Sequence, residues 1–120
     1  MRFMTMVKMR PDVGPPPAAL VEAMGKDMEE LFRTGTMVDA GSLSPGSTRI
    51  RVAADQVIVS DGPYAEATEV IGGYAITEVE SEAEAIAMAH DLVRIHQDYW
   101  PGWQGEVEVH RLHDGAPEAS

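Results

Sequence analysis

The apolar residues of this chain repeat with two different periods, and the order of these periods constrains the fold more than any other feature. Residues 2–9 form a short run typical of a strand, which ends at the proline-rich residues 11–17. From Pro17 to Gly35 the apolar residues follow the period of a helix. They are Leu20, Met24, Met28, Leu31 and Phe32. The start of the chain therefore predicts a strand followed by a helix.

The rest of the chain alternates between the same two patterns. A second helix is predicted from about residue 82 to 97, because Ser81 and Glu84 form a capping-box motif and residues 100–102 stop the helical pattern. Ala54 and Asp55 are expected at the turn of a hairpin. Strands are expected at residues 36–43, 48–52, 56–60, 72–79 and 105–112.

The resulting order is strand, helix, strand, hairpin, strand, helix, strand. Two helices on one face of an antiparallel sheet make an α+β domain, so we predict a ferredoxin-like βαββαβ fold with an inserted β-hairpin. The domain is expected to span residues 1–113, and residues 114–120 are expected to form a flexible C-terminal tail.

Both faces of the predicted sheet carry apolar residues. One face has Met4, Met6, Tyr74 and Ile76, and the other has Phe3, Val7 and Val79. Two helices can cover only one face, and soluble monomers rarely leave several hundred Å² of apolar surface in water. The pattern therefore predicts a two-fold homodimer that covers the second face.

The composition disfavours several classes of partner and site. The 120 residues include no cysteine, which removes disulfides, thiolate metal sites and cysteine nucleophiles. Nine basic and twenty acidic residues give a net charge of −11, which disfavours nucleic acid and anionic membranes as partners. Residues 1–9 lack the unbroken apolar run of a signal peptide or membrane span. We therefore expect a cytoplasmic protein.

Three segments carry a resemblance to a known family: "MRFMTMVK" at the start, "DGPYAEATEVIGGY" at residues 61–74, and "WPGWQGEVEVHRL" at residues 100–112. With these segments the chain resembles the YCII-related family, in its DGPF-domain branch. The resemblance implies a dimeric α+β barrel of ferredoxin-like subunits. Most members of the family have no assigned reaction, some resemble enzymes with a His/Asp pair, and some branches are associated with extracytoplasmic-function sigma factors.

The chain departs from the family motif at two positions. Tyr64 stands where the branch name has Phe, which adds a hydroxyl group. Thr68 stands where a Lys is usual, which removes a cation that could pair with Glu66, Glu69 or an anionic ligand. The second departure weakens any expected preference for an anion.

The motif supplies the candidate site residues of the 61–74 segment. Asp61 could accept backbone N–H groups in a turn, or its carboxylate could act as an acid, a base or a ligand anchor. The candidate ligand-binding residues are Tyr64, Glu66, Gly72, Gly73 and Tyr74. Glu66 could equally be solvated, and the glycine pair could equally form a β-bulge or a sharp strand entry.

His96 is the second candidate catalytic residue. At 100° per residue it falls within the apolar stripe of the second helix, whereas His90 falls at its border. It could be a buried neutral histidine bonded to the backbone, or a general base. The histidines lack metal-ligand spacing, and phosphate-loop and GxSxG motifs are absent. We therefore predict no metal site and no cofactor.

Three functional hypotheses follow. The first is a small enzyme that uses Asp61 and His96 for acid–base chemistry on a small molecule in a pocket at the sheet or dimer cleft. The second is a non-catalytic ligand-binding or regulatory module, linked to sigma-factor signalling. The third is a protein whose sheet serves only dimerisation or docking. Whether the chain is an enzyme stays open at this point.

Overall fold

A computed structural model describes residues 1–44, 46–61 and 69–113. The tail predicted at residues 114–120 lies outside this range. The elements are β1 (Arg2–Met9), α1 (Ala18–Arg33), β2 (Met37–Ser42), β3 (Thr48–Ala53), β4 (Gln56–Asp61), β5 (Val70–Glu78), α2 (Glu82–Tyr99) and β6 (Gly105–Leu112). No helix within the described ranges has both the length and the apolar character needed to cross a membrane.

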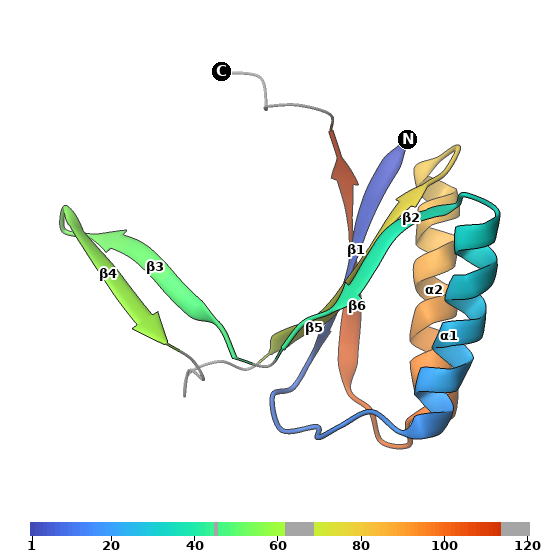
Figure 1. Cartoon of the computed structure of the whole chain (residues 1–120), viewed down its shortest axis with the longest axis horizontal. Coiled ribbons are helices and arrows are strands. Elements are labelled where there is room, and N and C mark those ends of the chain that lie inside the picture. Colours follow the sequence, from blue (N-terminus) through green and yellow to red (C-terminus); the bar gives the residue numbers. More distant parts are fainter. Residues whose placement is uncertain (45, 62–68, 114–120) are drawn as a thin grey trace.

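The main sheet has four antiparallel strands in the order β2-β5-β1-β6. Both helices lie on the same side of this sheet (Figure 1). The predicted α+β class, with two helices and antiparallel sheets, is confirmed, and the strand order is consistent with a ferredoxin-like domain.

The core lies between the main sheet and α2. Phe3, Val79 and Ala85 form its buried cluster, and Met88 and Val109 pack against it. Phe3 is only 1 % exposed. The predicted alternation is correct on this face, because Phe3 and Val79 are both buried here.

The opposite face of the main sheet, which we call the open face, carries no helix (Figure 1). Met4 lies opposite Ile76, and Met6 opposite Tyr74, across β1 and β5. Directly paired residues share a face of the sheet, so these four side chains form one apolar patch. All four are half-buried within a single chain.

Helix α1 begins after Pro17, which provides no side-chain cap, and is followed by Gly35 with φ +80°. One member of its predicted apolar stripe does not face the sheet. Phe32 is 43 % exposed, whereas Leu20 is buried. Twelve residues at about 100° each place Phe32 about 120° from Leu20 around the helix, which carries it off the inner face.

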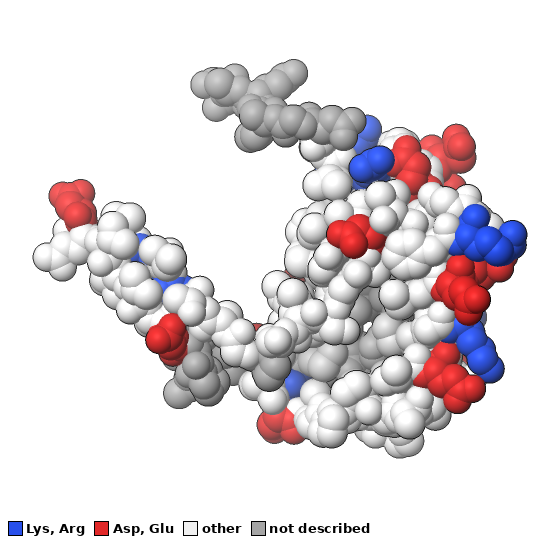
Figure 2. Space-filling view, viewed as in Figure 1, with Lys and Arg blue, Asp and Glu red and all other residues white. Residues whose placement is uncertain are grey.

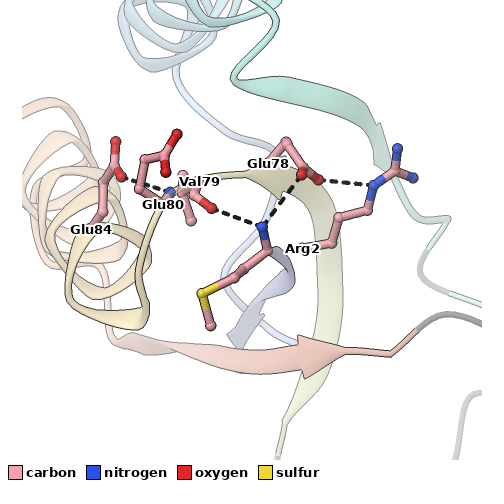
Figure 3. Close-up of polar contacts among 6 residues, drawn as sticks. Arg2, Glu78, Val79, Glu80 and Glu84 are labelled. Atoms are coloured by element: carbon pink, nitrogen blue, oxygen red, sulfur yellow. Dashed lines mark hydrogen bonds and ion pairs between the residues drawn. The ribbon is translucent and has the colours of Figure 1, made fainter.

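Helix α2 has a side-chain cap at its start. The Ser81 hydroxyl accepts the Glu84 N–H at 3.2 Å, as the capping-box motif predicts. The Glu84 carboxylate accepts the Glu80 N–H at 3.0 Å, one residue before the capping serine (Figure 3). Beside this turn Glu78 pairs with Arg2 at 3.0 Å, which ties the ends of β5 and β1 together.

Strands β3 and β4 pair with each other in a separate two-stranded sheet. Ala54 and Asp55, at the turn between them, have φ values of 52° and 63°. Two successive positive φ values match the right-handed twist of a tight two-residue hairpin turn. We call residues 48–61 the arm, because they project away from the main sheet on the side of the open face (Figure 1).

Candidate functional site

A cavity of about 780 Å³ lies between the main sheet and the two helices. The body is visibly hollowed there in Figure 2. The walls are mostly apolar, and the loop at Gly14–Pro16 contributes to the rim. Apolar lining residues include Val7, Leu20, Met24, Met28, Leu31, Met37 and Leu92. A cavity of this size and character is typical of small-molecule sites.

The cavity exists because the two helices sit on the sheet differently. Helix α2 buries Ala85 and Ala89, whose short side chains let it approach the strands closely. Helix α1 fully buries only Leu20. Its Met24 and Met28 line the cavity and remain half-buried. Helix α1 therefore covers the cavity, but its side chains do not fill it.

Three polar residues with little exposure line the cavity: Thr5 at 7 %, Thr77 at 3 % and His96 at 3 %. Among the described residues, the Thr77 hydroxyl has no hydrogen-bond partner. An unpaired buried hydroxyl costs about 1–3 kcal/mol, which a ligand that bonds to it recovers. The hydroxyl oxygen has almost no accessible surface, so a bound molecule reaches it only after the Thr77 side chain rotates.

His96 is held in one orientation. Its Nδ1 lies 2.8 Å from the Leu92 carbonyl oxygen, and because a carbonyl only accepts, Nδ1 must carry the proton. The Trp103 ring lies beside it, with ring centroids 4.6 Å apart. Burial lowers the pKa of His96, although the Leu92 carbonyl opposes the shift. His96 is thus neutral near pH 7, with a lone pair on Nε2.

Two carboxylates from different helices contribute to the lining. Asp27 lies on α1 and Asp91 on α2. Partial burial raises the pKa of Asp27, and the neighbouring Asp91 carboxylate raises it further. These two acids disfavour an anion in the cavity.

Asp61 lies elsewhere, at the end of β4 in the arm. It is exposed, and its Oδ1 accepts the Thr48 hydroxyl at 2.9 Å. Asp61 is not among the described residues that line the cavity, whereas His96 is. Within one chain the structure therefore does not bring the two candidate catalytic residues together.

Gly72 and Gly73 line the cavity, and Gly73 also has an architectural reason to be glycine, because its close neighbour is backbone. The β1–β5 register shifts between Val7 and Lys8, which leaves Gly72 in a β-bulge. A Cβ on Gly72 would meet the Met9 side chain at 2.7 Å, and one on Gly73 would lie 3.0 Å from the Gly41 carbonyl oxygen. The bulge that the sequence left as an alternative is present.

Tyr74 also contributes to the lining, but its ring lies beside Met6 on the open face. Its hydroxyl donates to Asp39 Oδ2 at 3.0 Å. This hydrogen bond to a carboxylate raises the pKa of Tyr74. The Tyr74 hydroxyl and His96 thus lie on opposite faces of the sheet.

Tyr64 and Glu66, the remaining candidates, lie outside the described residues. Within the described ranges, no three His, Asp or Glu side chains are grouped so that they could hold a metal ion. The sequence did not single out Thr77 and Thr5, although their inward positions among apolar neighbours follow from the strand period.

Residues 1–100 match the family model described as the YCII-related domain. The chain belongs to the YCII-related family. No curated protein matches the chain closely enough to be considered a relative. Membership confirms the family resemblance, and the DGPF branch stays a prediction.

Proposed function

We propose that this YCII-related protein binds a small molecule in the cavity beneath α1, and that His96 acts on that molecule as a general base. The orientation of His96 carries the proposal. Its Nδ1 is engaged by the Leu92 carbonyl, so Nε2 is the nitrogen that can accept a proton in the cavity. A neutral imidazole that is buried and fixed needs no reorientation to do so.

The lining defines the chemistry of the ligand. Apolar walls favour a molecule with little polar surface, and Asp27 and Asp91 disfavour an anion. His96 can accept a proton from a carbon that a neighbouring carbonyl group makes acidic. The favoured ligand is an uncharged apolar carbonyl compound, and the favoured reaction removes a proton from the carbon next to the carbonyl.

In this reaction the carbon–hydrogen bond breaks and its proton moves to His96 Nε2. The electron pair moves to the carbonyl oxygen, and the product is an enolate. Return of a proton to carbon completes the cycle. Asp61 has no part in these steps within one chain, and its catalytic role stays a prediction that Asp61→Asn tests.

A homodimer is part of the proposal. The patch of Met4, Met6, Tyr74 and Ile76 has no cover within the described chain, and a second copy packed face to face would bury it and form a dimeric α+β barrel. The domain boundary at residue 113, the cytoplasmic location and the link to sigma factors stay predictions from the sequence and the resemblance.

The cavity is tested with 2-tetralone, an apolar bicyclic ketone with acidic hydrogens next to its carbonyl. We expect the protein to bind it and to catalyse uptake of deuterium from D₂O at that carbon, followed by mass spectrometry. His96→Gln should abolish the catalysed uptake, whereas His90→Gln, an exposed histidine on the same helix, should leave it unchanged. Met24→Trp, which adds bulk to the cavity wall, should weaken binding about tenfold.

The outcomes separate the functional hypotheses. Binding without deuterium uptake supports the ligand-binding module and rejects the enzyme. Uptake that survives His96→Gln in a folded variant rejects His96 as the base. Equal binding by the wild type and by Met24→Trp rejects the cavity as the binding site and favours the hypothesis that the sheet serves only dimerisation or docking.

A further inference from the structure

The arm exposes an unusual amount of apolar side chain. Four β-branched residues lie on it at 61–72 % exposure. They are Ile50, Val52, Val57 and Val59. Figure 2 shows the arm as mostly uncharged, whereas acidic and basic side chains gather over the helices at the right of the view.

The strand register places these four residues together. Ile50 lies opposite Val59, and Val52 opposite Val57, so all four share one face of the two-stranded sheet. The other face carries polar neighbours such as Arg51 and Gln56. The face with the four apolar residues ends in the polar pair Thr48 and Asp61. A two-stranded hairpin alone in water is marginally stable, so an arm with four exposed apolar side chains on one face needs a surface to pack on.

The described part of its own chain does not supply that surface. Figure 1 shows the arm standing apart from the main sheet, across a wide gap from the open face. The radius of gyration is 16.4 Å. A compact chain of this length has about 14 Å. The described chain therefore presents two exposed apolar surfaces, the open face and the apolar face of the arm. They lie on the same side of the main sheet with a gap between them (Figure 1).

We propose that the arm clasps a second copy of this chain. In a two-fold pair the open faces pack together, and each arm lays its apolar face against the other copy. The inference rests on the proposed homodimer and adds to it a specific role for the arm. By the two-fold symmetry, the arm of each copy packs on the other copy. The two contacts are identical, so the assembly stops at a dimer.

The available area favours this occupant. Eight residues of β1 rise about 26 Å and four strands cover about 19 Å, so the open face offers roughly 500 Å². The six-residue strands of the arm add roughly 200 Å². A stable interface needs about 800 Å² per partner. The open face alone falls short of this area, and the arm brings the total close to it.

The test places lysines on the apolar face of the arm. Val52→Lys with Val57→Lys should weaken the dimer at least about tenfold, because two charges would have to be buried in the interface. The matched control is Ala53→Lys with Gln56→Lys, a neighbouring cross-strand pair whose side chains lie on the other face. Both double variants change the net charge from −11 to −9, so general repulsion is the same. Sedimentation velocity over a concentration series measures the dissociation constants.

The open-face variant Ile76→Lys distinguishes the arm from the dimer itself. If Ile76→Lys dissociates the dimer but Val52→Lys with Val57→Lys does not, the proposed role of the arm is wrong and the proposed dimer is retained. A wild type that is monomeric at micromolar concentration overturns both. Weakening by the Val52 and Val57 lysines, with the control unchanged, supports the clasp.

A second measurement does not depend on dissociation. Because the chain contains no cysteine, a single Val57→Cys variant can be labelled with a maleimide at one position. The clasp predicts that labelling of Val57→Cys slows as protein concentration rises, while labelling of Gln56→Cys does not. Slow labelling at concentrations where sedimentation shows a monomer would show that the arm folds onto its own chain, and equally fast labelling of monomer and dimer would show that it stays free. Either result overturns the proposal.

Discussion

The two helices lie on the same face of the same sheet, yet they bury very different amounts of their inner faces. Helix α2 buries Ala85, Ala89 and His96, and its residues reach the cluster around Phe3. Helix α1 buries Leu20 and holds its methionines over a cavity of about 780 Å³. Small residues brought α2 close to the strands, whereas long side chains keep α1 away from them.

This difference separates stability from binding. The α2 side holds the packed core, where removing atoms leaves a void that the surroundings cannot fill. The α1 side already has a void, so changes at its half-buried methionines should alter the shape of the cavity more than the free energy of unfolding. Three substitution experiments test the contrast, from the largest expected effect to the smallest.

Phe3→Ala should have the largest effect. The side chain is 1 % exposed and lies in the buried cluster with Val79 and Ala85, so its loss should cost about 3–5 kcal/mol. Domains of this size are stable by about 5–15 kcal/mol, so the variant should be close to unfolding. Urea denaturation provides the measurement, with Met4→Ala on the open face as the control. Equal costs for the two variants would show that the core is not on the α2 side.

Met28→Ala should have a smaller effect than Leu20→Ala, although both residues face inward from α1. Leu20 is 1 % exposed, so its replacement should cost about 2–5 kcal/mol. Met28 borders the cavity and is half-buried, so its replacement should cost about 1 kcal/mol. The enlarged cavity should also accept ketones bulkier than 2-tetralone. A Met28 cost as large as that of Leu20 would mean that the cavity is closed and packed in solution.

The pH dependence of His96 should give the smallest effect. Burial lowers the pKa of His96 in the folded chain below the ordinary value of about 6.5. Below about pH 6.5 the unfolded chain therefore binds a proton that the folded chain does not, so the free energy of unfolding falls as the pH falls. This contribution is fully present above that pH.

Urea denaturation between about pH 5 and 8 checks this dependence. His96→Gln should flatten the profile in this range, whereas His90→Gln should retain the slope, because His90 is exposed. A profile that His96→Gln leaves unchanged would show that His96 titrates normally and is not buried.

The local features of the fold were largely predictable. Strand β1 and strand β6 have the predicted bounds, and the turn at Ala54 and Asp55 is where the sequence placed it. The inward orientation of His96 followed from its angle on the helix. These features depend on neighbours within a few residues, which a single sequence displays.

The candidate site was harder to predict. The sequence emphasised Asp61 because of the motif around it, but the arm carries Asp61 away from the cavity that His96 lines. It did not emphasise Thr77, because a threonine in a strand is ordinary until its hydroxyl is seen to lack a partner. Both outcomes depend on which elements face each other.

The sequence by itself determined the periods of its apolar residues, and therefore the helices, the strands and the two apolar faces of the sheet. Only the tertiary structure decided that α1 stands away from the strands, that Thr77 and His96 share one cavity, and that the arm leaves its apolar face in water. The reason is physical: hydrophobic periodicity specifies which side of an element is buried, whereas the distance between elements depends on how side chains from distant segments interdigitate.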